Sequence, residues 1–250
     1  MKNLRIYNLL MGILHAVQGV VILVLSTDFK LPITTSYLQF NPEIMELTPR
    51  LEQLAELKIG LFVAMFLFLS ALAHLILVVP KVYEWYIKNI KKGINYARWI
   101  EYSVSSSLMI VLIAMLVGVY DLSTLILLFS INAMMIFCGW IMEVHNQATK
   151  KTNWISYIFG CFAGIVPWVI VALYLFGSGE GEFRAPDFVY WIFFSIFLFF
   201  NSFSLNMFLQ YKKIGKWKDY TFGEKMYILL SLLAKSALAW QIFAGTLRPV

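Results

Sequence analysis

Two charged side chains lie inside long apolar stretches of this sequence, where a charge is costly. Lys235 lies in SLLAKSALAWQIF, and Glu101 lies in ARWIEYSVSSS. At the centre of a membrane-spanning helix a charged lysine costs about 2.5 to 3.5 kcal/mol. Ions at this depth are tolerated when they are paired. We therefore predict that Lys235 and Glu101 face each other, either as an ion pair that only fixes helix packing or as a functional site.

The two side chains enter the bundle at different depths. Lys235 lies about nine residues into its predicted helix, which is roughly 14 Å at about 1.5 Å per residue. Glu101 enters from the same side and lies a little shallower. A direct contact between this carboxylate and a bare lysine amine would be strained. We expect a group extended from the lysine, or a water molecule, to bridge them.

Further polar and aromatic residues surround this pair in the predicted bundle. His15 and His74 lie at membrane depth in the first two apolar stretches. A lone buried histidine is usually a satisfied core residue, but two histidines with a glutamate and a lysine predict a polar cavity. Ser231 lies one turn before Lys235, alanines flank the lysine, and the sixth stretch is rich in phenylalanine. Small and aromatic neighbours fit an apolar slot for a long, flat ligand.

Seven apolar stretches are long enough to cross a membrane, which takes about 20 residues for about 30 Å of hydrocarbon. They are Ile6–Leu25, Leu57–Val79, Tyr96–Tyr120, Leu122–Met142, Trp154–Phe176, Phe188–Leu209 and Met226–Thr246. The chain is 60% hydrophobic and only 14% charged, whereas soluble domains average about one quarter charged. The first stretch is longer than the core of a signal peptide, and no small-x-small cleavage site follows it. We expect an all-α bundle of seven transmembrane helices, forming one domain over residues 1–250.

The residues between these stretches predict how the helices begin and turn. Asp121 alone separates the third and fourth stretches, which predicts a tight antiparallel helical hairpin. In TPRLE, Thr48 is predicted to cap a helix whose first residue is Pro49. Asn153 and Asp187 are predicted caps of the fifth and sixth helices. The one long connection, Ser26–Glu56, contains ITTSYLQF and predicts a short β-hairpin outside the membrane.

The basic residues fall mainly on one side of the predicted bundle. The side that carries the N-terminus has fourteen lysines and arginines, and the opposite side has five, namely Lys30, Arg50, Lys58, Arg184 and Arg248. Because positive residues concentrate in cytoplasmic loops, the N-terminus is predicted to be cytoplasmic and, with seven spans, the C-terminus extracellular. The net charge of +6 is then explained by attraction to anionic lipid headgroups, and nucleic acid is not needed as a partner.

Seven helices with a lysine midway along the seventh and a carboxylate in the third resemble the microbial rhodopsins. In that family the lysine binds retinal as a protonated Schiff base, and the carboxylate is its counterion. ARWIEYSVSSS has the family's helix-three spacing of an arginine, an acid and a hydroxyl, at Arg98, Glu101 and Ser105. Residues at i and i+4 lie on one face of a helix, so Glu101 and Ser105 can share a partner.

The inverted orientation, with WIEYS in helix three and LLAKSALAWQ in helix seven, resembles the heliorhodopsins along the whole chain. The resemblance implies that Lys235 binds all-trans retinal, that Glu101 is its sole counterion and that Ser231 is a hydrogen-bond partner. It implies that His15 and His74 belong to the polar cavity, and that the long connection forms a β-structure at a homodimer contact. Arg98 and Glu143 are expected to form a polar cluster, unless Glu143 is only a solvated helix end. The weaker pocket candidates are Met135, Trp168, Phe200 and Trp240.

Departures from the pumping microbial rhodopsins indicate a sensor. Pumps of that family usually carry a carboxylate eleven residues after the counterion and an aspartate four residues before the lysine, where this sequence has Leu112 and Ser231. We expect a light sensor with a slow photocycle and no net ion pumping, which signals to an unknown partner by conformational change. A light-gated proton channel or transporter is the alternative. A non-retinal receptor or a membrane enzyme is a third hypothesis, but no nucleophile and base at useful spacing support it.

Overall fold

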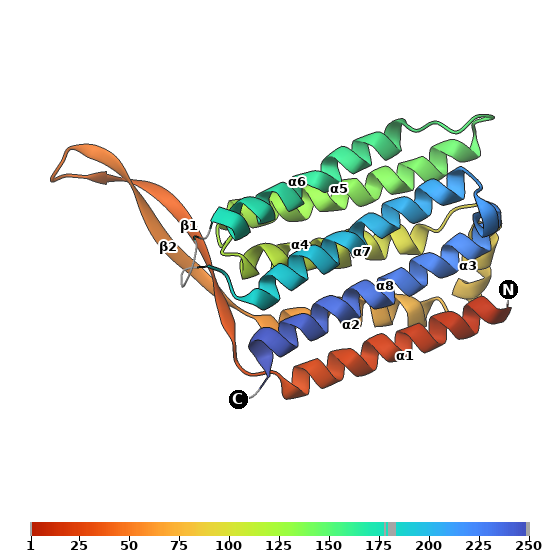
Figure 1. Cartoon of the computed structure of the whole chain (residues 1–250), viewed down its shortest axis with the longest axis horizontal. Helices are drawn as coiled ribbons and strands as arrows, with labels where there is room; N and C mark the ends of the chain where they lie inside the picture. The colour runs from red at the N-terminus through yellow and green to blue at the C-terminus, as the bar shows by residue number, and fades with distance from the viewer. Residues whose placement is uncertain (1, 178, 180–183, 249–250) are drawn as a thin grey trace.

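The computed structural model describes residues 2–177, 179 and 184–248. Its long helices run side by side, and a two-stranded ribbon projects from one end of the bundle (Figure 1). The helices are α1 (Lys2–Leu25), α2 (Ile59–Ile76), α3 (Pro80–Ile90), α4 (Tyr96–Leu116), α5 (Leu122–Gln147), α6 (Ile155–Gly177), α7 (Asp187–Tyr211) and α8 (Tyr220–Ile242). The strands are β1 (Lys30–Asn41) and β2 (Glu46–Lys58), and two short helices are η2 (Gly215–Lys218) and η3 (Phe243–Leu247).

Within the described residues, seven helices are long and apolar enough to cross a membrane. They are α1, α2 and α4 to α8, so the predicted all-α bundle of seven transmembrane helices is confirmed. The main error in their bounds concerns the seventh span, because α8 begins at Tyr220 and not at Met226. The Asp219 side chain accepts a hydrogen bond from the Thr221 N–H at 2.9 Å and caps this earlier start.

Asp121 joins α4 to α5 as the sequence predicted. Its carboxylate accepts a hydrogen bond from the Thr124 N–H at 2.8 Å and caps α5. Asn153 lies two residues before the first residue of α6 and not at the cap position, although its side chain accepts the Ile155 N–H at 2.9 Å. Asp187 does not act as the cap of α7: Pro186 occupies that position, and Asp187 is the first helical residue and pairs with Arg184.

The helix start predicted at Thr48 and Pro49 is wrong, because both residues lie within β2. Thr48 pairs with Gln39, and Pro49 pairs with Leu38. Proline is tolerated here because each strand of a two-stranded ribbon has a free edge and does not need every N–H. The hairpin is confirmed, but its strands of 12 and 13 residues make it longer than expected. At about 3.3 Å per residue it extends roughly 40 Å.

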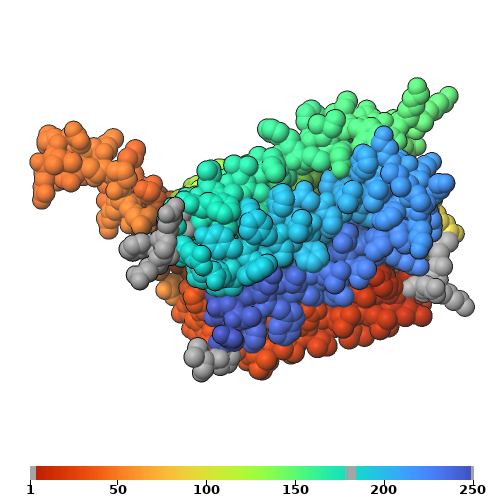
Figure 2. Space-filling view, viewed as in Figure 1, coloured from red at the N-terminus to blue at the C-terminus, as the bar shows by residue number. Residues whose placement is uncertain are grey.

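Only the base of the ribbon is fastened to the bundle. The Thr34 N–H donates to the Tyr120 carbonyl at 2.9 Å, and the Ile59 N–H donates to the Phe29 carbonyl at 3.0 Å. Asp28 pairs with Lys58 at 2.8 Å, and this hydrogen bond lowers the pKa of Asp28. The rest of the ribbon stands clear of the bundle (Figure 2).

The helices pack around α4, whose second half is buried on all sides. Residues 109–115 of α4 form the middle of the main apolar core, together with side chains from α2, α6, α7 and α8. Helices α1 and α2 approach closely, since a Cβ added at Gly19 would lie 2.7 Å from the Phe68 ring. Small residues at such contacts are typical of membrane helix packing. The core therefore fixes α4 against α8, the two helices that carry Glu101 and Lys235.

Candidate functional site

Lys235 and Glu101 form a direct ion pair at the centre of the bundle. The Nζ atom of Lys235 lies 2.8 Å from Oε1 of Glu101, and the two side chains are only 4% and 10% exposed. Lys235 also donates to the Ser231 hydroxyl at 3.0 Å. The predicted pairing is therefore present, and Ser231 contacts the lysine as the resemblance implied.

The expectation that a direct contact would be strained was wrong. Helices α4 and α8 run in the same direction, and a side chain on a helix leans toward the N-terminus of that helix. The long Lys235 side chain therefore leans back toward the level of Glu101, and its Nζ reaches Ser231 one turn earlier. The length of the Lys235 side chain therefore spans the difference in depth between Lys235 and Glu101.

Ser70 is a partner of Glu101 that the sequence analysis missed. Its hydroxyl donates to Oε1 of Glu101 at 2.6 Å, so Ser70 and Lys235 both contact the same carboxylate oxygen. Ser70 is fully buried in α2, one turn before His74. The spacing of Ser70 and His74, which places both on one face of the helix, was the available signal.

His15 and His74 lie beside each other on the α1–α2 side of the ion pair. Their rings stack with centroids 5.8 Å apart and an interplanar angle of 7°. Nδ1 of His74 is 2.7 Å from the Asn8 side-chain oxygen. Neither ring nitrogen of the buried His15 has a partner among the described residues. The side chains predicted to form a polar cavity therefore lie together, but neither histidine lines the cavity that extends from Lys235. Asn8 holds His74 in place, and His15 has no hydrogen-bond partner among the described residues.

A cavity of about 180 Å³ extends from Lys235 between α4, α5, α6, α7 and α8. Met135, Trp168 and Phe200 line it, as predicted for pocket residues. Trp168 makes edge-to-face contacts with Phe197 and Phe200, at centroid distances of 5.3 and 5.5 Å. The shape and apolar walls suit a long, flat, apolar ligand that reaches the lysine.

Ser105 and Trp240, two other predicted pocket residues, differ in their positions. Ser105 lines the cavity one turn beyond Glu101, and its buried hydroxyl has no hydrogen-bond partner among the described residues. Trp240 does not line this cavity. It is 38% exposed, and its indole N–H donates to the Gln18 side chain at 3.0 Å.

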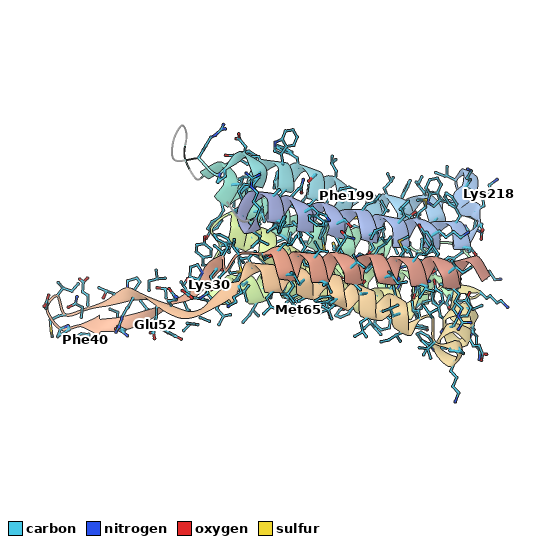
Figure 3. All side chains as sticks on the ribbon, turned by 90° about the horizontal axis from the view of Figure 1, so that it is seen from below. Lys30, Phe40, Glu52, Met65, Phe199 and Lys218 are labelled. Atoms are coloured by element: carbon cyan, nitrogen blue, oxygen red, sulfur yellow. The ribbon has the colours of Figure 1, made fainter. Side chains whose placement is uncertain are left out.

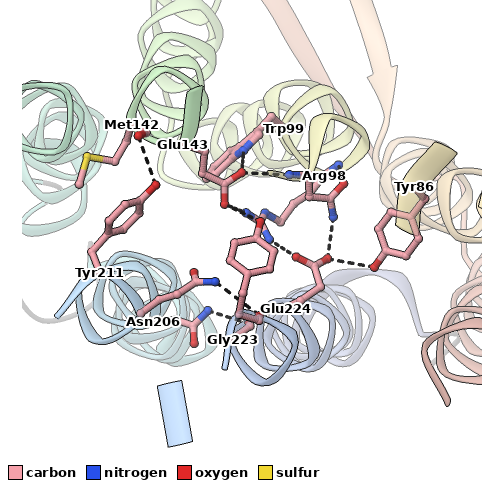
Figure 4. Close-up of polar contacts among 12 residues, drawn as sticks. Tyr86, Arg98, Trp99, Met142, Glu143, Asn206, Tyr211, Gly223 and Glu224 are labelled. Carbon is pink, nitrogen blue, oxygen red and sulfur yellow. Dashed lines mark hydrogen bonds and ion pairs between the residues drawn. The ribbon is translucent and has the colours of Figure 1, made fainter. Parts of the chain in front are cut away.

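Arg98 belongs to a second buried cluster (Figure 4). It lies near the starts of α4 at Tyr96 and α8 at Tyr220. Its guanidinium pairs with Glu143 of α5 and Glu224 of α8. Glu143 also accepts hydrogen bonds from the Trp99 indole at 2.6 Å and the Tyr220 hydroxyl at 2.9 Å. The predicted contact of Arg98 with Glu143 is confirmed, and the alternative of a solvated helix end is wrong because Glu143 is buried.

Glu224 is the member of this cluster that the sequence analysis missed. It accepts hydrogen bonds from Asn95 at 2.6 Å and from the Tyr86 hydroxyl of α3 at 3.3 Å. Burial, with a further contribution from Glu224, raises the pKa of Tyr86 well above its ordinary value and keeps it a neutral donor. Glu224 was overlooked because the predicted seventh helix began two residues after it, at Met226.

Several solved structures share this fold, among them the following two. One is a light-driven proton pump from Leptosphaeria maculans, with a TM-score of 0.67 and 13% identity, covering 98% of this chain and 96% of that chain. The other is the transmembrane domain and linker region of a rhodopsin phosphodiesterase from Salpingoeca rosetta, with a TM-score of 0.70 and 11% identity, covering 98% of this chain and 71% of that chain. At these identities the likeness shows the fold alone.

Sequence comparison distinguishes among the proteins that share this fold. No curated protein matches the sequence. The family model named Heliorhodopsin matches residues 4–247, which is nearly the whole chain. The chain therefore belongs to the heliorhodopsin family.

Proposed function

We propose that the chain is a light sensor that holds all-trans retinal on Lys235, has a slow photocycle and pumps no ions. Family membership implies a retinal photoreceptor, and the proposal adds the isomer, the residues and the absence of transport. The observation that carries it is the apolar cavity that ends at Lys235 beside Glu101. Bound there as a protonated Schiff base, retinal supplies the absorption of visible light and the isomerisation.

The chain's own residues would hold this chromophore and its charge. Glu101 lies 2.8 Å from the lysine nitrogen and would act as the counterion. Ser231 and Ser70 would fix the two partners by hydrogen bonds, and Met135, Trp168 and Phe200 would flank the polyene. A proton released near Lys235 would remain within the cluster that contains His15 and His74. Light absorption by a bound chromophore needs no catalytic nucleophile, so we propose that the protein is a receptor and not an enzyme.

The absence of pumping is proposed from the residues that surround the pair. Ser231 and Leu112 occupy the positions where pumps usually carry carboxylates, and Leu112 is fully buried in the apolar core. The two other buried carboxylates near α4, Glu143 and Glu224, are both paired with Arg98. Neither is free to extend a proton path from Glu101 through the bundle.

We also propose an orientation and an assembly. The N-terminus would be cytoplasmic and the C-terminus extracellular in the cell membrane, because fourteen basic residues lie on the N-terminal side against five on the other. Residues 1–250 would form one retinal-binding domain. The ribbon would contribute to a homodimer, and a signalling partner of unknown identity would recognise the light-activated conformation.

A light-gated proton channel or transporter is the second candidate. It is favoured by His15, whose two buried ring nitrogens lie beside the ion pair and have no hydrogen-bond partner among the described residues. A buried imidazole of this kind can accept a proton and pass it on. Whole-cell recording under voltage clamp tests this alternative, and light-induced currents would overturn the proposal of a sensor without transport.

The decisive test is a visible spectrum of the protein expressed with all-trans retinal. We expect a visible band in the wild type and no such band in Lys235→Ala. Lys225→Ala is the matched control, because Lys225 lies on the same helix and does not line the cavity. No band in the wild type, or a band that survives Lys235→Ala, would contradict the retinal site.

Glu101→Gln tests the counterion within the same experiment. Removing the negative charge beside Lys235 lets positive charge spread along the polyene, which lowers the excitation energy. We therefore expect the absorption maximum to move to longer wavelength. An unchanged maximum would show that Glu101 is not the counterion.

A further inference from the structure

The short helix α3 was not predicted, and it lies across the end of the bundle where α8 begins (Figures 1 and 3). Its Tyr86 and Ile90 side chains are buried against the bundle. Trp85, next to Tyr86, is 44% exposed. Helices with one apolar face against protein and a mixed aromatic and basic outer face are typical of the membrane interface.

Trp85 begins a continuous strip of aromatic rings that leads from α3 to the side of the bundle. Its ring lies 6.1 Å from Tyr96, at the start of α4, and Tyr96 lies 5.7 Å from Trp140 of α5. Trp140 in turn lies 6.3 Å from Phe137. Tryptophan and tyrosine favour the boundary between lipid headgroups and hydrocarbon. The strip therefore connects the headgroup level of α3 to the hydrocarbon-facing surface of α5.

A groove of about 430 Å³ lies on α5 where this strip ends. It is lined by Phe137, Trp140, Ile141, Val144 and His145. Phe137, Ile141 and Val144 are 37%, 52% and 45% exposed, so the groove opens outward from the bundle. Its apolar wall, on the outside of a transmembrane helix, fits a lipid acyl chain.

Two lysines flank Trp85 on the outer face of α3. Lys81 is four residues before Trp85 and Lys88 is three after it, so all three lie on neighbouring turns of one face. Both lysines are exposed, and the one acidic residue of α3, Glu84, lies between them on the same face, which leaves this face with a net positive charge. Among the described residues, neither lysine forms an ion pair with a carboxylate.

The same end of the bundle is strongly basic as a whole. Its exposed lysines are Lys81, Lys88, Lys91, Lys92, Lys150, Lys151, Lys212, Lys213, Lys216 and Lys218, and its exposed acidic residues are Glu84 and Asp219. The positive charge at this end favours binding of an anionic partner, and the neighbouring groove on α5 favours a partner with an apolar chain. An anionic lipid has both properties, whereas a nucleic acid has only the first.

We propose that α3 and α5 form a binding site for an anionic phospholipid. The acyl chain lies in the groove beside Trp140, and the phosphate lies at Trp85 between Lys81 and Lys88. The site is independent of Lys235 and the retinal cavity. Its ligand comes from the leaflet that surrounds this end of the bundle, and it ties α3, and through Tyr86 the Glu224 cluster, to the membrane surface.

Native mass spectrometry tests the site on the full chain. The protein is released from nanodiscs that contain equal amounts of phosphatidylglycerol and phosphatidylcholine, and the retained lipids are counted. We expect preferential retention of phosphatidylglycerol, reduced about tenfold in the double variant Lys81→Gln/Lys88→Gln. The matched control is Lys216→Gln/Lys218→Gln, which removes the same charge from η2 at the same end. An equal loss in both variants would show general attraction to the surface and overturn the site.

Fluorescence quenching by brominated lipids locates the ligand without relying on the lysine variants. Brominated phosphatidylglycerol should quench the wild-type tryptophans more strongly than brominated phosphatidylcholine at the same mole fraction. Trp85→Phe and Trp140→Phe should each remove part of that difference, and Trp191→Phe, a 70% exposed residue of α7, should not. Equal quenching by the two lipids would overturn the proposal, and binding of RNA or an acidic protein in their place would assign the lysines to that partner.

Discussion

Glu101 of α4 contacts side chains from two other helices, Ser70 of α2 and Lys235 of α8. One oxygen of its carboxylate contacts both Lys235 and Ser70, at 2.8 and 2.6 Å. A hydrogen bond to a carboxylate draws negative charge toward the donor and is stronger than a bond between neutral groups. Ser70 therefore reduces the negative charge that Glu101 presents to the lysine nitrogen.

Ser70→Ala is expected to move the visible absorption maximum to shorter wavelength. Without the donor at 2.6 Å, the carboxylate presents more negative charge at Lys235 and holds the positive charge there more tightly. The shift should be opposite in sign to that of Glu101→Gln and smaller, because the charge is kept. Ser103→Ala is the control, since the Ser103 hydroxyl donates to the Ile100 carbonyl of its own helix and does not line the cavity. A shift to longer wavelength in Ser70→Ala would contradict the proposed role.

The sequence could reveal some residues of this site and not others. Lys235 and Glu101 were predictable because a charge in an apolar stretch is costly and needs a partner. Ser70 was not, since serine is common in membrane helices and costs little there. Glu224 was missed because hydropathy alone placed the start of the last helix at Met226, whereas the cap at Asp219 begins it at Tyr220.

At the scale of elements, Arg98 holds three helices together at one level of the bundle. It extends from α4 to Glu143 of α5 and to Glu224 of α8, and its guanidinium also stacks on the Tyr227 ring at 3.9 Å. Tyr227 lines the cavity that ends at Lys235. The cluster therefore supports the floor of the cavity and fixes α8, the helix that carries the lysine.

Arg98→Ala should lower the free energy of unfolding by about 3 to 5 kcal/mol, because it leaves two buried carboxylates without their cation. Arg98→Lys should recover only part of this loss, since an ammonium lacks the forked geometry that reaches two glutamates. Equilibrium unfolding in mixed SDS micelles measures both. Arg5→Ala is the control, because Arg5 is exposed and donates one hydrogen bond to a backbone carbonyl. Equal stabilities of Arg98→Ala and Arg5→Ala would contradict this role.

Element boundaries were harder to predict than the elements themselves. The seven spans follow from the length of their apolar stretches. The second strand of the ribbon was confused with a helix start because Thr48 and Pro49 have the residue types of a helix N-terminus. What decides their conformation is pairing with Gln39 and Leu38, which lie nine and eleven residues away in the sequence. Local patterns do not contain that information.

At the scale of the whole molecule, the two ends of the bundle have different surfaces. One end carries α3 and most of the exposed lysines, and the other carries the ribbon. The distal ribbon exposes many large apolar side chains, such as Leu38 at 67%, Leu51 at 71% and Met45 at 74%. An exposed apolar surface of this kind marks an interaction site. It supports the proposal that the ribbon contributes to a homodimer.

Removing the distal ribbon should convert the proposed dimer to a monomer and leave the bundle folded. The variant replaces residues 37–50 by Asn-Gly, which joins the paired residues Ser36 and Leu51 in a tight turn. The base of the ribbon stays, and it is the base that packs on the core through Phe29, Leu31 and Ile33. Light scattering after size exclusion measures the mass, and an unchanged visible spectrum would show that the retinal site survives. A truncated protein that remains dimeric would place the contact on the helices, and a monomeric wild type would contradict the dimer itself.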